Sequence, residues 1–224
     1  MNMPQFDAHI ISTSHANSYS ADNWFRRFVC ANSRGHRELD VQFTSYQRSG
    51  EADRELFDNV KIWEACRATS AATTFFSPIK IGRNGQEFLD GGTIANNPIR
   101  KLWKEARGVW GAQLEAQIQC IVSIGTGMPG VEPFGDDVLA IGKTLLAIAT
   151  ETEITASDFA QEHEELEDRN GLYRFNVLQG LQDVGLEDAG ARSKIADMTM
   201  AYGQRDMQRS LRSFKRTVGD VISA

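Results

Sequence analysis

A capped amphipathic helix followed by an apolar strand is the feature that most restricts how this sequence can fold. Asn97 is a good helix N-cap, and Pro98 occupies the first helical position, where its missing N–H costs nothing. Apolar side chains then recur at helical spacing, at Ile99, Leu102, Trp103, Ala106, Val109 and Trp110. The segment 119–124, which is continuously apolar at 120–122, predicts a strand directly afterwards. This order implies a parallel crossover, so the sequence predicts an α/β fold with a mostly parallel sheet and flanking helices.

The remaining elements follow from shorter patterns. Strands are predicted at 27–31, 41–46, 86–89 and 172–177, and helices at 62–73, at 139–166 and from residue 192 onward. In the first of these helices, Ile62, Ala65, Cys66 and Thr69 share one face, which predicts that this face is buried. Residues 1–23 are polar and aperiodic and are expected to form a loose lead-in, with a single domain over 24–224.

Composition excludes several classes of protein. The 224 residues are 41% hydrophobic with a net charge of −6, typical of a soluble globular chain. An acidic chain does not favour nucleic-acid binding, because neutralising phosphates needs clustered Lys and Arg. Three cysteines without a C-x-x-C spacing and no recognisable leader peptide predict a cytoplasmic location.

Three motifs suggest chemistry but favour structural interpretations. The segment 125–130 matches G-x-G-x-x-G, yet the prolines and glycines that follow prevent a helix from opening there, so no dinucleotide cofactor is expected. Eight carboxylates lie between residues 151 and 168, but they scatter around the predicted helix and indicate a solvated face rather than a metal site. The cations of the last helix could face a membrane, although ordinary packing of its apolar stripe on a core is favoured.

The segment Asp90–Gly91–Gly92 is the best candidate for a functional site. A D-G turn is common in hairpins, but this one leads toward a capped helix instead of a partner strand. A carboxylate at the carboxyl end of a strand stands where open α/β sheets place their chemistry. Asp90 is therefore the candidate catalytic residue.

Taken together, three blocks resemble the patatin-like phospholipases. They are ACRATSAATTFF at 65–76, FLDGGTIANNP at 88–98 and VSIGTG at 122–127. The later segments TETEITASDF, YRFNV and GLQDVGLED resemble the longer patatin domains of fungal proteins. The resemblance implies a lipid acyl hydrolase with a Ser–Asp dyad that needs no metal and no organic cofactor.

The resemblance also implies roles for individual residues. Asp90 would be the carboxylate that takes the proton of the nucleophilic serine. Gly91 and Gly92 would let the backbone turn tightly beside it. Asn96, Asn97 and Pro98 would be structural, because they start the next helix.

The sequence departs from the family where the nucleophile should be. It contains no G-x-S-x-G elbow and no glycine-rich oxyanion loop, and Ser70, Ser77 and Ser123 are not flanked by glycines in an elbow. The expectation is therefore the C-terminal portion of a patatin-like domain, a partial fold whose exposed sheet edge could promote self-association.

Three functions stay open at this point. The chain is part of a phospholipase A-type ester hydrolase and supplies its Asp, or it is an inactive module that binds lipid or a partner protein, or another polypeptide supplies the missing serine. In the first case the partners would be a phospholipid or other acyl-lipid ester and, transiently, a membrane surface.

Overall fold

The computed structural model describes residues 8–13, 28–34, 39–44, 56, 59–72, 75–128, 136–185 and 188–222. These residues divide into two compact units. One comprises residues 17–96, and the other comprises 1–16 together with 97–224. The predicted domain boundary at residue 24 lies outside the described residues and stays a prediction.

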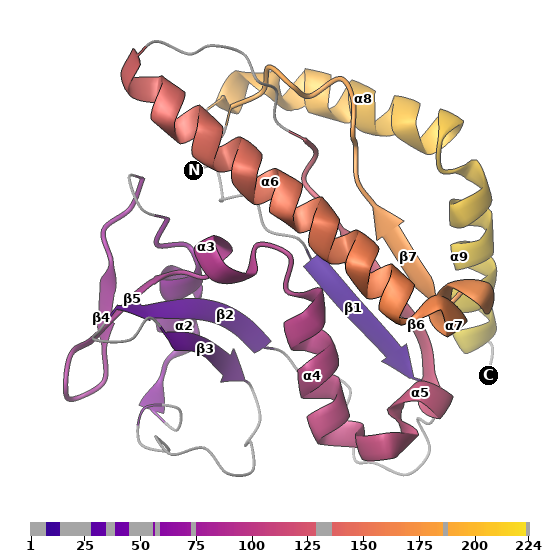
Figure 1. Ribbon diagram of the computed structural model, residues 1–224, viewed down its shortest axis with the longest axis horizontal. Coiled ribbons are helices and arrows are strands. Elements are labelled where there is room, and N and C mark those ends of the chain that lie inside the picture. Colours follow the sequence, from indigo (N-terminus) through magenta and orange to yellow (C-terminus); the bar gives the residue numbers. More distant parts are fainter. Residues whose placement is uncertain are drawn as a thin grey trace. The chain divides into compact units, whose positions relative to one another are not determined.

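The unit of residues 17–96 contains a four-stranded antiparallel sheet. Its strands lie in the order β3-β2-β5-β4, with bounds Leu39–Thr44, Phe28–Arg34, Gln86–Asp90 and Ile79–Ile81. Helix α2, Ile62–Thr69, packs on this sheet, and the short helix α3, Gly92–Ala95, follows β5 (Figure 1). Its core consists of Phe43, Leu56, Ala68, Ile81 and Phe88.

The second unit contains a three-stranded sheet in the order β1-β6-β7, with bounds Ala8–Thr13, Ile118–Ile124 and Leu172–Phe175. Strand β1 runs antiparallel to β6, whereas β6 and β7 are parallel. The helices of this unit are α4 (Ile99–Trp110), α5 (Leu114–Gln117), α6 (Asp136–Glu162), α7 (Glu164–Asp168), α8 (Arg192–Arg205) and α9 (Gln208–Ile222) (Figure 1). Short 3₁₀ turns cover Gly111–Gln113 and Ala189–Ala191.

Strand β6 is buried on both faces, which explains why its residues 120–122 are continuously apolar. Ile121 packs in a cluster with Trp103 of α4 and Phe159 of α6. Its neighbours Cys120 and Val122 belong to a different cluster, which also contains Tyr173 of β7 and is covered by Phe214 of α9. Phe214, from the apolar stripe of α9, therefore packs on the sheet, which agrees with the favoured interpretation for this residue.

The mixed α/β class is confirmed, and the parallel crossover lies later in the chain than expected. It joins β6 to β7 through α6 and α7, whereas the strands on either side of α4 belong to different sheets. Among the described strands, the other pairs are antiparallel. No helix in the described part of the chain is long and apolar enough to cross a bilayer.

Two local predictions are wrong. Residues 8–13, inside the stretch expected to be a loose lead-in, form β1, because their backbone groups pair with β6; residues 1–7 and 14–23 lie outside the described part. In α2 the buried side chain is Ala68. Ile62 and Cys66 are exposed, because the face of small alanines is the one that approaches the sheet.

Candidate functional site

Asp90 is the last residue of β5, as the sequence analysis requires of a strand-end carboxylate. Its backbone pairs with Ala31 of β2 in the antiparallel register. The Asp90 backbone N–H donates to the carbonyl oxygen of Ala71, a residue just beyond α2, at 3.1 Å. The position of Asp90 is therefore set by two elements of its unit, the sheet and the segment after α2.

The Asp90 carboxyl is buried and electrostatically unusual. Only 4% of the residue is exposed. Burial raises the pKa of this carboxyl from 3.8 to about 6, because ionisation in a poorly solvated site is unfavourable. A hydrogen bond from the Gly92 N–H to Oδ1, at 2.7 Å, acts in the opposite direction. A carboxyl with this pKa can accept a proton near neutral pH and later release it.

Gly91 has an ordinary backbone conformation. Its φ and ψ are −69° and −15°, in the right-handed helical region that any residue adopts, and the residue is buried. The turn is helical: the Ala95 N–H donates to the Gly91 carbonyl oxygen at 2.8 Å. The expectation that Gly91 supplies special backbone freedom is therefore wrong. At Gly92, what the structure shows is a backbone N–H bonded to the Asp90 carboxylate.

The Asn96–Asn97–Pro98 segment lies at the division between the two units. Asn96 ends α3 in a helical conformation. Asn97 is buried, and its Oδ1 accepts a hydrogen bond from the Ile99 N–H at 3.2 Å, while its Nδ2 donates to the carbonyl oxygen of Thr152 at 3.0 Å. The Pro98 carbonyl accepts the first helical bond of α4, from Leu102 at 2.8 Å. Asn97 and Pro98 thus start α4, one residue out of register with the predicted cap.

A buried polar cluster beyond β6 was not predicted from the sequence. Arg174 of β7 donates to Ser123 Oγ at 2.9 Å and to Glu153 Oε1 at 2.5 Å. The same Glu153 oxygen accepts from Asn176 Nδ2 at 2.8 Å, and Asn176 Oδ1 accepts from the Gly127 N–H at 2.7 Å. The scattered carboxylates of 151–168 predict a solvated face, which is wrong for Glu153. An arginine inside a short strand was the available signal, because a strand packed on a core must give that charge a partner.

The two glycines after β6 have structural roles beside this cluster. A Cβ on Gly125 would come within 2.5 Å of the Asn176 side chain and 2.7 Å of an Arg174 nitrogen. Gly127 has φ +96°, a conformation that L side chains rarely adopt. The glycines therefore let the chain leave the sheet closely over the polar cluster. Residues 129 and 130 of that motif lie outside the described part.

The other acids of the 151–168 stretch do not converge. Glu162 forms a bidentate exposed pair with Arg100 of α4, and Glu165 lies 3.4 Å from His163. Among the described residues, no three His, Cys, Asp or Glu side chains are grouped so that they could hold a metal ion.

Of the three serines considered as nucleophiles, Ser70 and Ser123 have hydroxyl contacts away from Asp90. Ser70 donates its hydroxyl to the Cys66 carbonyl oxygen, a bond typical of a serine at a helix end. Ser123 is buried and accepts from Arg174. Ser77 offers its backbone carbonyl to Arg67 at 2.5 Å. None of these contacts places a serine hydroxyl on the Asp90 carboxylate.

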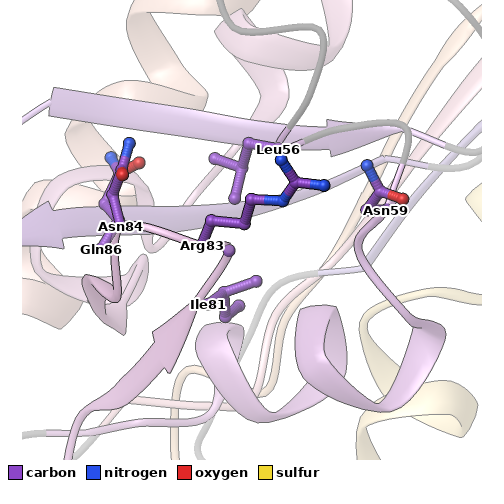
Figure 2. Close-up of a pocket in the computed structure, with 7 residues that line it drawn as sticks. Leu56, Asn59, Ile81, Arg83, Asn84 and Gln86 are labelled. Atoms are coloured by element: carbon purple, nitrogen blue, oxygen red, sulfur yellow. The ribbon is translucent and has the colours of Figure 1, made fainter.

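A small cavity of about 280 Å³ lies near the β4–β5 turn. Figure 2 shows the Arg83 guanidinium extending past Leu56 toward the side of Asn59, while Asn84 and Gln86 lie at the opposite end. The polar groups do not converge on one point, and Asp90 is not among the lining residues. This cavity is therefore separate from the candidate catalytic carboxylate.

Comparison with known proteins finds a family whose model matches part of this chain. Residues 19–103, which include Asp90 and the whole described sheet around it, match the family described as patatin-like phospholipase. The resemblance seen in the sequence is confirmed over this part of the chain.

Individual proteins are similar to this chain over parts of its length. The rabbit (Oryctolagus cuniculus) calcium-independent phospholipase A2-gamma is 26% identical over 166 residues, which is 73% of this chain and 20% of that protein. The rat (Rattus norvegicus) protein of the same name is 37% identical over 67 residues, 30% of this chain and 8% of that protein. A probable inactive patatin-like protein 9 of Arabidopsis thaliana is 35% identical over 57 residues, 24% of this chain and 15% of that protein. The chain thus spans a fifth or less of the length of these relatives.

Proposed function

We propose that this chain supplies the catalytic aspartate of a patatin-like lipid acyl hydrolase. The observation that carries the proposal is Asp90, a buried strand-end carboxyl whose pKa is raised to about 6, within the segment that matches the phospholipase family. The substrate class would be a phospholipid or another acyl-lipid ester, as the names of the relatives suggest.

In this mechanism Asp90 is the general base of a Ser–Asp dyad. The carboxylate takes the proton of the serine hydroxyl as the serine oxygen attacks the ester carbonyl, and returns a proton to the departing alcohol. The hydrogen bond from the Gly92 N–H to Oδ1 holds the carboxylate in a fixed orientation for these transfers. Because the pKa lies near neutrality, both proton transfers are accessible at physiological pH.

The nucleophile must come from a G-x-S-x-G segment, which these 224 residues do not contain. The test therefore joins the nucleophile-bearing segment of the rabbit relative to the N-terminus of the full chain, so that β1 is retained. We expect the chimera to hydrolyse a short-chain ester and to be labelled by a fluorophosphonate. Asp90→Asn should lower kcat by at least about 10³-fold, as loss of a base does in related acyl-transfer sites.

The matched control is Asp158→Asn, since Asp158 is an exposed aspartate on α6. That variant should retain full turnover. Retained turnover in Asp90→Asn, with labelling intact, would contradict the role assigned to Asp90.

A second candidate function is a catalytically inactive module that binds lipid or a partner protein. The absent elbow favours it, and so does the similarity to the Arabidopsis protein whose name marks it as inactive. This alternative predicts no fluorophosphonate labelling of the chain by itself. A labelled serine in the purified chain would refute it.

The cytoplasmic location, the absence of nucleic-acid partners and self-association through a sheet edge stay predictions from the sequence. Transient contact with a membrane follows from the proposed substrate, and the structure suggests a surface for it.

A further inference from the structure

Helix α2 presents its large apolar side chains to solvent. Its small residues Ala65 and Ala68 pack against the core of the unit. On the opposite side, 86% of Ile62 and 59% of Trp63 are exposed. An eight-residue helix that buries alanines and exposes isoleucine and tryptophan reverses the usual amphipathic arrangement.

These side chains line a shallow open groove rather than standing alone. Ile62, Trp63, Cys66 and Arg67 recur at i, i+1, i+4 and i+5, so they form one stripe along α2. The segment Pro78–Lys80, which includes the start of β4, forms the other side of the groove. Two more exposed aromatic residues, Phe75 and Phe76, follow α2 in the same unit. We call the groove with these aromatics the α2 surface.

The α2 surface is basic although the whole chain carries a net charge of −6. Among the described residues that line the groove, three are cations, Lys61, Arg67 and Lys80, and none is a carboxylate. Lys61 and Lys80 are exposed. The Arg67 guanidinium lies 5.5 Å from the centre of the Phe76 ring, which joins the charged and aromatic parts of the surface.

Two acids in the described part of the chain flank the groove without lining it. Glu64 accepts a hydrogen bond from the Lys61 N–H at 2.8 Å and thereby caps α2. Glu87 lies opposite Lys80 in the β4–β5 register. The groove itself therefore combines apolar side chains, an exposed tryptophan and positive charge.

We propose that the α2 surface docks this chain on a bilayer that contains anionic lipids. Tryptophan and isoleucine enter the interfacial region of a bilayer, while lysine and arginine pair with anionic headgroups. This surface would be the part of the proposed lipid hydrolase that contacts the lipid phase. The proposal rests on the proposed function only for the expectation that lipid is a partner.

Charge decides between this occupant and a second copy of the chain. A two-fold symmetric dimer through the α2 surface would place the cations of one copy against those of the other. Such like-charge contacts oppose association, whereas an anionic bilayer complements them.

The test measures sedimentation of the full 224-residue chain with sucrose-loaded vesicles. We expect binding to phosphatidylcholine–phosphatidylserine vesicles, weaker binding to pure phosphatidylcholine, and loss of the difference at high salt. The double variant Lys61→Gln/Lys80→Gln should weaken binding about 30-fold, at roughly one headgroup interaction per charge. Ile62→Ser/Trp63→Ser should weaken binding to both vesicle types by at least about 10-fold.

The matched controls lie in the other unit. Ile154→Ser removes an exposed isoleucine from α6, and Lys104→Gln removes an exposed lysine from α4. Both should bind as the wild type does. All of the substituted positions are exposed enough that circular dichroism should show unchanged folding, which separates docking from stability.

Three results would overturn the inference. The first is absence of binding to the anionic vesicles, and the second is a loss of vesicle binding in the control variants equal to that in the α2 variants. The third is a dimer, detected by light scattering without vesicles, that the α2 variants dissociate, because it would assign the surface to a second copy. Asp90→Asn should bind vesicles normally. Vesicle binding without ester hydrolysis in the chimera would therefore contradict the proposed function alone, and the reverse would contradict only the docking surface.

Discussion

Two carboxylates, one in each unit, are held by their surroundings in opposite ways. Asp90 lies at the end of β5, almost wholly buried, with a backbone N–H on one oxygen and a pKa raised to about 6. Glu153 of α6 is half-buried, and its Oε1 receives both the Arg174 guanidinium and the Asn176 amide. The first site disfavours the negative charge, whereas the second is built around it.

The comparison separates a carboxylate suited to proton transfer from one that stabilises the fold. A carboxylate that receives hydrogen bonds from a cation and an amide ties together the elements that carry them, so it fixes structure. A buried carboxyl that is costly to ionise gives up folding free energy and gains a proton affinity near neutral pH. The predictions below test this contrast, from the largest expected change to the smallest.

The Glu153 side of the contrast is tested by Arg174→Met. This variant leaves Glu153 partly buried without its cation and removes a donor from Ser123, so we expect a loss of about 3 kcal/mol in the free energy of unfolding. Urea denaturation measures it. Arg100→Met breaks the exposed pair with Glu162 and should cost much less, because solvent screens that pair. Equal losses in the two variants would show that burial does not distinguish these ion pairs.

Asp90→Asn should have the opposite effect on stability, and the size should depend on pH. The native pKa of about 6 lies above the usual 3.8, so folding favours the protonated form. That contribution is complete below pH 3.8 and is lost as pH rises through about 6. The asparagine side chain does not titrate, so the variant should gain stability over the wild type across this interval, reaching at most about 3 kcal/mol at neutral pH.

Urea denaturation at several pH values measures this difference. Asp158→Asn serves again as the exposed control and should follow the wild type. A stability difference between Asp90→Asn and wild type that is the same at acid and neutral pH would contradict the raised pKa. The same substitution that abolishes hydrolysis in the chimera should therefore stabilise the fold.

Gly125→Ala tests how closely the polar cluster is packed. The added methyl would overlap the Asn176 and Arg174 side chains, so we expect a loss of about 1–3 kcal/mol. Gly108→Ala is the control, because no atom lies within 4 Å of the added Cβ and Gly108 is in the interior of α4. That variant should gain about 0.5–1 kcal/mol from helix propensity. Thermal unfolding of both variants measures the contrast, and a neutral Gly125→Ala would show that the cluster can shift.

Local pattern determined most of the regular elements of this protein. Helix α4 and strand β6 are predictable from the local sequence. A capped 3.6-residue period of apolar side chains indicates a helix, and a short continuous apolar run indicates a buried strand. The Asp90 turn can be predicted because the sequence shows that a capped helix, not a partner strand, follows it. The segment that matches the family also includes this turn.

Tertiary structure alone decided which faces and charges are buried. Periodicity in α2 shows that residues share a face but not which face meets a partner, and the sheet accepted the alanines rather than Ile62. In the acidic stretch, only the approach of Arg174 from β7 distinguishes Glu153 from its solvated neighbours. The pairing of β1 with β6 is equally non-local. Burial and ion pairing depend on residues far away in sequence, so a local pattern carries no information about them.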